Sequence, residues 1–378
     1  MKPSWDIFCR VVDNFGDIGV CWRLARQLAA EHGLAVRLWV DDLAPFARFC
    51  PAINIGQDIQ TVAGVSVCRW CDPFPDVVPG DVVVEAFACE IPRSFQLGMT
   101  QRSSAPAWIN LEYLSAESWV AGSHGLPSPQ SNLTKYFLFP GFVAGTGGLL
   151  RERDLISARD KFQRDKTALA EFWHSFGVTS PRGDELRVSL FCYENRALET
   201  LLRQWADGSS QVTCLVPEGV AATALSGFFD TPSIATNSTY AAGNLRVQAI
   251  PFLQQDDYDR LLWACDVNFV RGEDSFVRAQ WAARPFVWQI YPQDENAHHI
   301  KLEAFLDLFC ADMPTAMATR LCTFWRAWNG ADFAPAAWDE WLESRSYIGS
   351  QTDSWAETLA RQADLATTLV NFTSDLLK

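Results

Sequence analysis

The feature that most constrains the fold is a repeated alternation of short apolar runs with segments of helical periodicity. In the first half of the chain these runs are rich in Val, Ile and Phe and only a few residues long, which is typical of buried strands. Residues 18–31 place Val20, Leu24 and Leu28 on one face of a predicted helix. Strands that alternate with helices form βαβ units, so we expect a parallel sheet. The predicted strands of this half are residues 7–12, 36–40, 82–87 and 108–111.

The same alternation begins again at Leu186. Before it, residues 115–148 are rich in Gly, Ser and Pro and are predicted to be a loop, and residues 151–166 are predicted to be helical. The chain ends in a predicted amphipathic helix over residues 355–377. The second set of predicted elements has strands at residues 187–192, 212–216, 245–250, 267–270 and 286–290, and a helix at residues 196–205.

A chain of 378 residues is long enough for two domains, each with its own core. We predict an α/β fold with two Rossmann-like domains, residues 1–180 and 181–354, that face a central cleft. The C-terminal helix, residues 355–378, could pack back on the first of them. In such sheets ligands bind outside the carboxyl ends of the strands, so the residues that follow the strands are the first candidates for a site.

The charge balance excludes some classes of partner. The 31 Lys and Arg residues against 45 Asp and Glu give a net charge of −14. Most of such a surface repels nucleic acid and anionic membranes, so we expect neither as a partner. Any polyanionic ligand must therefore be held by a few local donors.

The 11 cysteines are odd in number and scattered, which is typical of reduced core residues in a cytoplasmic protein. The N-terminus lacks the apolar segment of a signal peptide, and no apolar stretch approaches the ~20 residues that cross a bilayer. We therefore expect a cytoplasmic protein.

The turn after the first predicted strand carries Asp13, Gly16 and Asp17. A dinucleotide-binding fold would have a G-x-G-x-x-G pattern here, and this chain lacks it. Because carboxylates repel phosphate, the turn better suits a cationic or hydroxylic acceptor. In the alternative interpretation, Asp17 is an N-cap of the next helix and Asp13 is an Asx-turn residue.

Residues 271–275, with the sequence RGEDS, follow a predicted strand and open a predicted helix. Backbone N–H groups at a helix N-terminus bind phosphate, and Arg271 and the Ser275 hydroxyl can add hydrogen bonds. The alternative is an ordinary capped helix with acids in its first turn. Three aromatic residues at the ends of other strands of this half could stack on a base: Phe191, Tyr193 and Phe252. Gln255 could form hydrogen bonds with the edge of that base.

Three patterns raise the question of a metal. Asp257 and Asp259 form a D-x-D pattern, but they lie where a helix begins, so a capping role is expected. His298 and His299 are adjacent and would point in different directions from a helix. The C-x-x-C pattern at residues 68–71 has no second ligand pair at zinc-finger spacing. We therefore expect no metal site.

Four stretches of unusual sequence carry a family resemblance: WDIFC at residues 5–9, DNFGDIGV at residues 13–20, RGEDSF at residues 271–276 and FVWQIYPQ at residues 286–293. They resemble the EarP family of bacterial protein-arginine rhamnosyltransferases, which modify translation elongation factor P. The similarity extends over the whole chain.

The resemblance implies a GT-B glycosyltransferase whose first half receives the acceptor protein and whose second half holds dTDP-β-L-rhamnose. Rhamnose would pass to one arginine of elongation factor P with inversion at the anomeric carbon, without a cofactor. In the family this modification activates the factor, which relieves ribosomes stalled at polyproline. The resemblance assigns essential carboxylates (Asp13, Asp17, Glu273), an acceptor loop (Asn14, Phe15, Gly16) and a donor site (Phe191, Tyr193, Phe252, Gln255, Arg271, Asp274, Ser275).

For these residues our hypothesis is that Asp17 takes the proton as the C–N bond forms, while Asp13 orients the guanidinium. Arg271 and the helix N-terminus would stabilise the leaving dTDP. Glu273 could hold the ribose or rhamnose hydroxyls instead of the acceptor. Two other functions stay open at this point: a Rossmann-type oxidoreductase, and a non-catalytic module that only binds elongation factor P.

Overall fold

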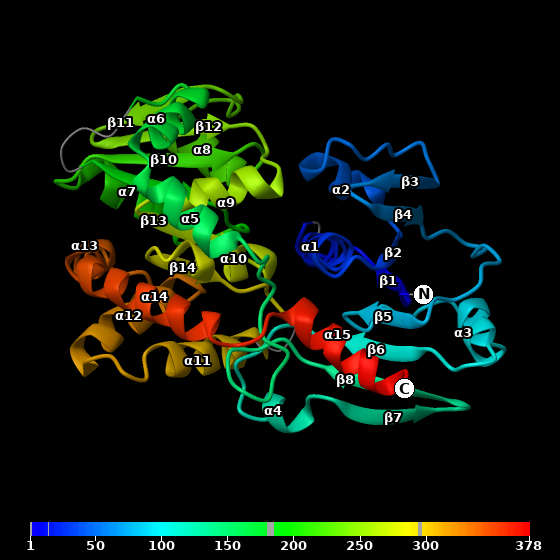
Figure 1. Cartoon of the computed structure of the whole chain (residues 1–378). Coiled ribbons are helices and arrows are strands. Elements are labelled where there is room, and N and C mark those ends of the chain that lie inside the picture. The colour runs from blue at the N-terminus through cyan, green and yellow to red at the C-terminus, as the bar shows by residue number, and fades with distance from the viewer. Residues whose placement is uncertain (1, 14, 180–184, 294–296) are drawn as a thin grey trace. The chain divides into compact units, whose positions relative to one another are not determined.

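The computed structural model describes residues 2–13, 15–179, 185–293 and 297–378. The chain divides into two compact units, the first made of residues up to 153 together with 359–378, and the second of residues 154–358. Each unit is built on its own sheet (Figure 1). This confirms the two Rossmann-like units of the predicted fold, and the two units are described separately below.

Within the described residues, the first unit has an eight-stranded sheet of order β3-β4-β2-β1-β5-β6-β8-β7. The six inner strands are parallel, and β3 and β7 are antiparallel strands at the two edges. The elements are β1 (Ser4–Cys9), α1 (Gly16–His32), β2 (Ala35–Val40), α2 (Leu43–Phe49), β3 (Ile59–Val62), β4 (Val65–Arg69), β5 (Val82–Ala86), α3 (Arg93–Thr100), β6 (Ala107–Leu111), α4 (Val120–Ser123), β7 (Leu126–Gln130), β8 (Leu133–Leu138) and α15 (Leu365–Leu376).

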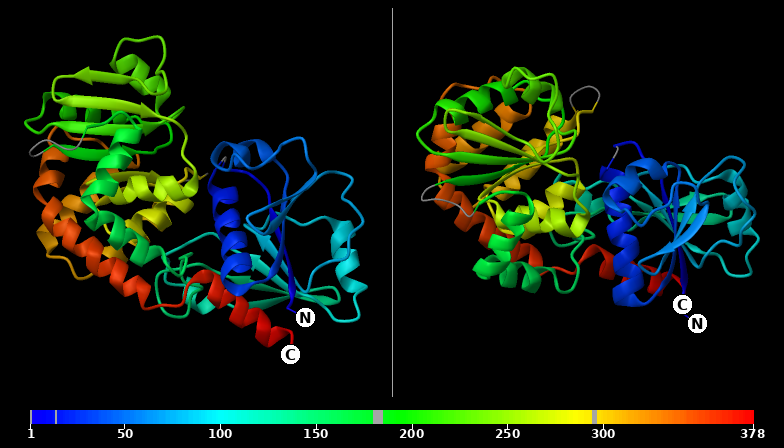
Figure 2. Two further views of the ribbon diagram at one scale, coloured as in Figure 1. Left: turned by 45° about the horizontal axis from the view of Figure 1, so that its top comes forward. Right: turned by 90° about the horizontal axis from the view of Figure 1, so that it is seen from above.

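The position of β1 in the middle of this sheet determines where a ligand can bind. The chain leaves β1 toward β2 on one side, and later leaves β5 toward β6 on the other. Right-handed crossovers therefore place α1 and α3 on opposite faces of the sheet, as Figure 2 shows. Between β1 and β5 the loops at the carboxyl ends separate, and this is the switch point at which α/β sheets bind ligands.

The second unit repeats this arrangement in a sheet of order β11-β12-β10-β9-β13-β14, as far as its residues are described. Only β11 is antiparallel, and β9 and β13 flank the switch point. The elements are α5 (Leu155–Arg164), α6 (Lys166–Ser175), β9 (Leu186–Leu190), α7 (Leu198–Asp207), β10 (Val212–Pro217), α8 (Ala222–Phe228), β11 (Thr239–Ala242), β12 (Leu245–Ile250), α9 (Gln255–Ala264), β13 (Val267–Arg271), α10 (Asp274–Ala282), β14 (Phe286–Gln289), α11 (Ala297–Phe309), α12 (Thr315–Trp328), α13 (Ala337–Glu343) and α14 (Arg345–Ala360).

The boundary between the units lies earlier than the predicted one at residue 180. The helices α5 and α6 belong to the second unit, because their side chains bond and pack there. Arg159 donates to the carbonyl of Trp281 over 2.8 Å, and Gln163 donates to that of Ala282 over 3.0 Å. Trp173 of α6 packs into a cluster with Ile250.

The predicted C-terminal helix is interrupted. The helix α14 ends at Ala360 and α15 begins at Leu365, because the Asp364 side chain accepts a hydrogen bond from the backbone N–H of Thr367 and caps a new helix. Arg151 donates to the carbonyls of Ala360 and Gln362 and holds the break against the first unit. The prediction that the chain end packs on the first unit is confirmed for α15.

Two further predictions were wrong in detail. Residues 115–148 are not only loop, because they contain α4 and the antiparallel pair β7–β8, whose Pro-containing strand β7 lies at the sheet edge. The first strand ends at Cys9 and not at residue 12. Beyond it the backbone leaves the sheet, and the N–H groups of Val11 and Val12 bond to the carboxylates of Asp41 and Asp17.

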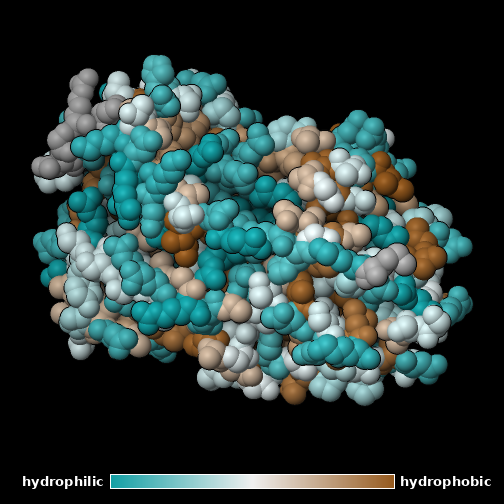
Figure 3. Space-filling model, viewed as in Figure 1, coloured by the Kyte–Doolittle hydropathy of each residue, from teal (hydrophilic) through white to brown (hydrophobic). Residues whose placement is uncertain are grey.

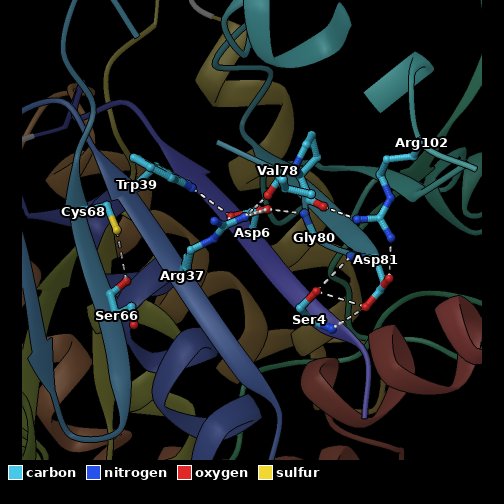
Figure 4. A network of polar contacts seen from close by, with 11 residues as sticks. Ser4, Asp6, Arg37, Trp39, Ser66, Cys68, Val78, Gly80, Asp81 and Arg102 are labelled. Atoms are coloured by element: carbon cyan, nitrogen blue, oxygen red, sulfur yellow. Dashed lines mark hydrogen bonds and ion pairs between the residues drawn. The ribbon is translucent and has the colours of Figure 1, made fainter. Parts of the chain in front are cut away.

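A buried carboxylate at the start of β1 anchors the first unit (Figure 4). Asp6 is fully buried and accepts two hydrogen bonds from Arg37, at 2.7 Å each, and one from the indole of Trp39. It also accepts from the backbone N–H of Gly80 over 2.6 Å. Next to it, Asp81 accepts from the backbone N–H of Ser4 and has a lowered pKa, because this bond favours the charged form. The network ties β1 and β2 to the loop before β5.

The surface drawn in Figure 3 is mostly hydrophilic, and apolar residues appear there in small separate groups. Among the helices of the described ranges, none is both long enough and apolar enough to cross a membrane.

Candidate functional site

Asp17 is a buried carboxylate at the switch point of the first sheet. It is the second residue of α1, and only 2 % of it is exposed. Its Oδ2 accepts hydrogen bonds from the backbone N–H groups of Val12 and Asp13, each over 2.8 Å. Its Oδ1 accepts from the Tyr113 hydroxyl over 3.3 Å. The interpretation of Asp17 as an N-cap is therefore wrong, because its carboxylate bonds backward to the loop and not to the N–H groups of its own helix.

The pKa of Asp17 is raised above its usual value, and burial is the main cause. The bonds from the Asp13 and Val12 N–H groups and from Tyr113 lower this pKa, and the negative charge of Asp13 raises it further. A carboxylate that burial makes more basic, and that fixed donors hold in one orientation, is suited to accept a proton.

Phe15 and Gly16 of the predicted acceptor loop lie immediately before Asp17 at the start of α1. Asn14 lies outside the described residues. Phe15 precedes α1 without a capping side-chain bond, and the Arg48 guanidinium lies over its ring, 5.8 Å from the centroid. A side chain at Gly16 would place its Cβ 2.5 Å from Oδ2 of Asp13, so glycine leaves room for the Asp13 carboxylate. Asp13 and Asp17 therefore lie together, as predicted.

The second sheet gathers a cationic and aromatic group at its own switch point. Arg271 ends β13, and its guanidinium lies 4.4 Å from the ring centroid of Phe191 and 4.5 Å from that of Tyr193. It donates to the Cys192 carbonyl over 2.9 Å. Phe191 and Tyr193 follow β9, the neighbouring strand, so strand order brings these three predicted donor residues together.

The start of α10 directly follows Arg271 in the chain. Gly272 has φ +58, a conformation that glycine adopts without strain, and its carbonyl accepts from the Trp288 indole over 2.7 Å. Glu273 is at the N-cap position and makes no capping side-chain bond, which does not support the interpretation of an ordinary capped helix. Asp274 is the first helical residue.

Ser275 has a different role from the one expected. Its hydroxyl accepts from the Arg271 backbone N–H over 3.0 Å and donates to the Arg271 carbonyl. The side chain therefore closes the turn that carries Arg271. The backbone N–H groups at the helix start remain the feature suited to phosphate.

Phe252 lies beside the same group, and Gln255 follows it three residues later in the chain. The rings of Phe252 and Phe191 are 6.2 Å apart, and the ring of Tyr258 is 5.6 Å from that of Phe191. Gln255 is the first residue of α9 and is buried. The predicted donor residues thus come from the ends of β9, β12 and β13 and from the starts of α9 and α10.

Both aspartates of the D-x-D pattern form ion pairs with arginines. Asp257 pairs with the exposed Arg260 over 3.1 Å. Asp259 is buried and forms a two-pronged pair with Arg278 of α10, at 2.9 and 2.6 Å. Capping was thus the wrong prediction for Asp259, which instead joins α9 to α10.

No group of three or more His, Cys, Asp or Glu side chains is placed to hold a metal ion within residues 2–13, 15–179, 185–293 and 297–378. His298 accepts a hydrogen bond from the Gln293 backbone N–H. Cys68 is buried and Cys71 exposed, and both are free thiols. The absence of a metal requirement stays a prediction.

Sequence reasoning missed three residues of these sites. Gln289 of β14 accepts from the Tyr193 backbone N–H over 2.9 Å and donates to the Glu194 carbonyl. Phe87 and Tyr113 follow β5 and β6; Tyr113 bonds to Asp17, and Phe87 stacks on Tyr113. The rule that sites lie at the carboxyl ends of strands would have pointed to both Phe87 and Tyr113, since Phe87 ends the predicted strand 82–87 and Tyr113 lies two residues beyond the predicted strand 108–111.

Comparison with known proteins gives a consistent result over the whole chain. A family model described as Elongation-Factor P (EF-P) rhamnosyltransferase EarP matches residues 5–374. The protein-arginine rhamnosyltransferase of Pseudomonas aeruginosa is 49 % identical over 375 residues, which cover 99 % of this chain and 100 % of the relative. That of Shewanella oneidensis is 40 % identical over 389 residues, and covers 97 % of each chain.

Solved structures support the same fold. A structure described as the basis for EarP-mediated arginine glycosylation of translation elongation factor EF-P has a TM-score of 0.73 and 35 % identity, and covers 99 % of both chains. MurG of Acinetobacter baumannii is 10 % identical with a TM-score of 0.50 and also covers 99 % of both chains, which shows a likeness of fold alone. The fold is that of the GT-B glycosyltransferases, as predicted.

We predict that Asp259→Asn destabilises the second unit by about 3–5 kcal/mol, because it leaves the buried Arg278 charge without its counter-charge. The matched control is Asp257→Asn, whose exposed pair with Arg260 contributes at most about 0.5 kcal/mol. Hydrogen–deuterium exchange of the α10 amides measures the free energy of opening in both variants. Equal protection of α10 in the two variants would contradict the supporting role of Asp259.

Proposed function

Because this chain belongs to the EarP family of elongation factor P rhamnosyltransferases, we propose that it transfers L-rhamnose from dTDP-β-L-rhamnose to an arginine of translation elongation factor P. The observation that carries the proposal is the buried Asp17, held by two backbone N–H groups beside a second carboxylate. A pair of carboxylates is complementary to a guanidinium, and it is a poor site for phosphate. The modification would activate the factor for ribosomes stalled at polyproline.

The second unit supplies the chemistry for the donor. Arg271 would pair with the diphosphate at the start of α10, where the helix dipole also favours negative charge. Phe191 and Phe252 offer ring faces for the thymine base, and Gln255 offers an amide for its edge. Tyr193 and Ser275 would fix Arg271, and Asp274 and Glu273 would face sugar hydroxyls. Glu273 belongs to the same turn as Arg271, which favours the donor over the acceptor as its partner.

The acceptor arginine is a weak nucleophile, because its guanidinium is protonated and delocalised. Its pKa and that of an ordinary Asp differ by about 9–10 units, or about 13 kcal/mol, so complete deprotonation before attack is excluded as a route. The raised pKa of Asp17 narrows this gap. The proton therefore passes to Asp17 while the C–N bond forms, and Asp13 holds the guanidinium in place.

The bond changes define the stereochemistry. The arginine nitrogen attacks the anomeric carbon as the bond from that carbon to the phosphate oxygen breaks, so the configuration inverts. The electron pair of the broken bond leaves with dTDP, whose negative charge Arg271 and the start of α10 stabilise. These donors supply the charge stabilisation that a metal would otherwise give, so the proposed reaction needs none. The proposed location of the reaction is the cytoplasm.

Two other functions are less well supported. An oxidoreductase would need the glycine pattern that the turn after β1 lacks, and here that turn presents carboxylates. A module that only binds elongation factor P would have no use for the cationic and aromatic group of the second unit.

Intact-mass spectrometry tests the function directly. Elongation factor P is incubated with this protein and dTDP-rhamnose in the presence of EDTA. We expect a mass increase of one deoxyhexose, which fragmentation places on a single arginine. No mass increase, with folded acceptor and bound donor, would contradict the proposed transfer, and loss of the increase only on addition of EDTA would contradict metal independence.

We predict that Asp17→Asn lowers the transfer rate by about 10²–10⁴-fold without loss of stability. Above its raised pKa, the charged Asp17 destabilises the folded state, and this cost disappears as pH falls below the unfolded value. Asparagine carries no charge, and its amide can accept from the Val12 and Asp13 N–H groups and donate to Tyr113. At neutral pH the thermal midpoint should thus be equal or higher, measured beside the initial transfer rate. Full turnover in the variant would show that Asp17 is not the base.

We predict that Gly16→Ala impairs the acceptor side alone. The new Cβ would lie 2.5 Å from Oδ2 of Asp13 and force this flexible carboxylate to move. A displacement of this size lowers kcat/KM for elongation factor P by about 10–100-fold, while KM for the donor stays unchanged. The matched control is Gly122→Ala, since a Cβ at Gly122 meets no atom within 4 Å. Equal steady-state kinetics in the two variants would show that Asp13 is not part of the acceptor site.

A further inference from the structure

The loop after β5 has a strained backbone next to Asp17. Phe87, Ala88 and Glu90 all have positive φ, at 56°, 52° and 55°, although none is glycine. Such conformations cost on the order of 1–3 kcal/mol each and persist only where surrounding contacts enforce them. Strain of this kind concentrates at functional sites, so the purpose of this loop conformation requires an explanation.

Local bonds enforce the loop conformation. The Phe87 backbone N–H donates to the Leu111 carbonyl over 2.7 Å, which joins the loop to the end of β6. The Glu90 N–H donates to the buried side chain of Glu85 over 3.0 Å, and Glu85 is paired with Lys135. The thiol of Cys89 donates to the Phe8 carbonyl of β1 over 3.4 Å. The loop is thereby attached to three strands of the sheet.

The conformation places the Phe87 ring on Tyr113. The two rings are stacked, with centroids 4.3 Å apart and planes at 15°. The Tyr113 hydroxyl then lies 3.3 Å from Oδ1 of Asp17 and donates to it. A chain of contacts therefore leads from the strained loop through two aromatic rings to the buried carboxylate.

The two oxygens of Asp17 have different surroundings. Two backbone N–H groups occupy Oδ2, whereas the one donor to Oδ1 among the described residues is Tyr113. A carboxylate oxygen has two acceptor positions. Among the described residues a single side-chain hydroxyl thus orients Oδ1, and an oxygen with two acceptor positions can accept from an incoming N–H as well.

We propose that Tyr113, clamped by Phe87, is a positioning residue that orients Oδ1 of Asp17 to receive the proton of the acceptor guanidinium. This inference rests on the proposed function and assigns Tyr113 no direct contact with the substrate. The strain of the Phe87 loop is explained as the means of holding the tyrosine ring in place. Aromatic stacking limits the ring to one plane, and the hydroxyl can then reach Asp17 only from one direction.

The groups that face Asp17 determine how the reaction depends on pH. They are Asp13 on the preceding loop, Cys9 at the end of β1, and Tyr113 after β6. The charge of Asp13 raises the pKa of Asp17, and the Tyr113 bond lowers it. Burial raises the pKa of the Cys9 thiol, so Cys9 stays neutral where Asp17 titrates. Removal of the tyrosine hydroxyl therefore raises the pKa of Asp17.

The test is the pH profile of kcat for Tyr113→Phe with saturating donor. We expect the acid limb to move toward higher pH, so that kcat falls by about tenfold at the acid end and recovers as pH rises. KM for the donor should stay unchanged. Phe87→Leu, which removes the stacking partner and keeps Tyr113, should move the limb in the same direction by less.

Tyr136→Phe is the matched control, since Tyr136 lies in the same unit and its ring packs edge-on against Phe372. Its profile should coincide with that of the unchanged protein. A Tyr113→Phe profile with an unmoved acid limb, whether or not kcat falls uniformly, would overturn the positioning role. Failure of the proposed function is recognised separately, because the unchanged protein would then give no mass increase of elongation factor P at any pH.

Discussion

The order of the parallel strands is the constraint on which both candidate sites depend. In each unit the first strand lies inside the sheet, and the chain builds outward from it on one side before it crosses to the other. The loops at the carboxyl ends of the two central strands therefore diverge, and only side chains can fill the space between them. In the first unit this space receives Asp13, Asp17 and Phe87. In the second it receives Phe191, Tyr193 and Arg271, so one topology carries two different chemistries.

The two sites differ in how they stabilise charge. Asp17 is buried, and its burial penalty exceeds the help of its hydrogen bonds, so its pKa is raised. This arrangement sacrifices stability for basicity, which is the usual compromise at a proton-transfer site. Arg271 instead lies between aromatic faces and donates to a carbonyl, which holds a permanent cation in a fixed place. The buried pair of Asp259 and Arg278 then fixes the helix that would bind the phosphate.

The sequence was sufficient to predict what depends on local pattern. The strand at residues 245–250 was predicted with the bounds of β12, because Gly243 and Asn244 precede it and Pro251 follows it. Asp13, Asp17 and Arg271 were predicted as site residues from their position in the turns directly after predicted strands. The resemblance to one family added the assignment of the remaining donor residues.

Features that depend on tertiary contacts could not be predicted. Ser275 was expected to face a ligand, and only the structure shows its hydroxyl bonded to the Arg271 backbone. The helices α5 and α6 were assigned to the wrong unit, since their partners Trp281 and Ile250 are distant in sequence. The left-handed conformation of Phe87 has no signal in the sequence, which places this residue at the end of the predicted strand 82–87. In each case the decisive partner lies on another element.

In the proposed reaction the second unit binds the donor without a metal, and Asp17 acts only on the acceptor side. Isothermal titration of dTDP-rhamnose in EDTA, into the unchanged protein and into the Asp17→Asn and Arg271→Ala variants, tests this division most directly. We expect one site with the same dissociation constant for the unchanged protein and Asp17→Asn, and a large loss of affinity for Arg271→Ala. Loss of donor binding in Asp17→Asn, or unchanged binding in Arg271→Ala, would contradict this division.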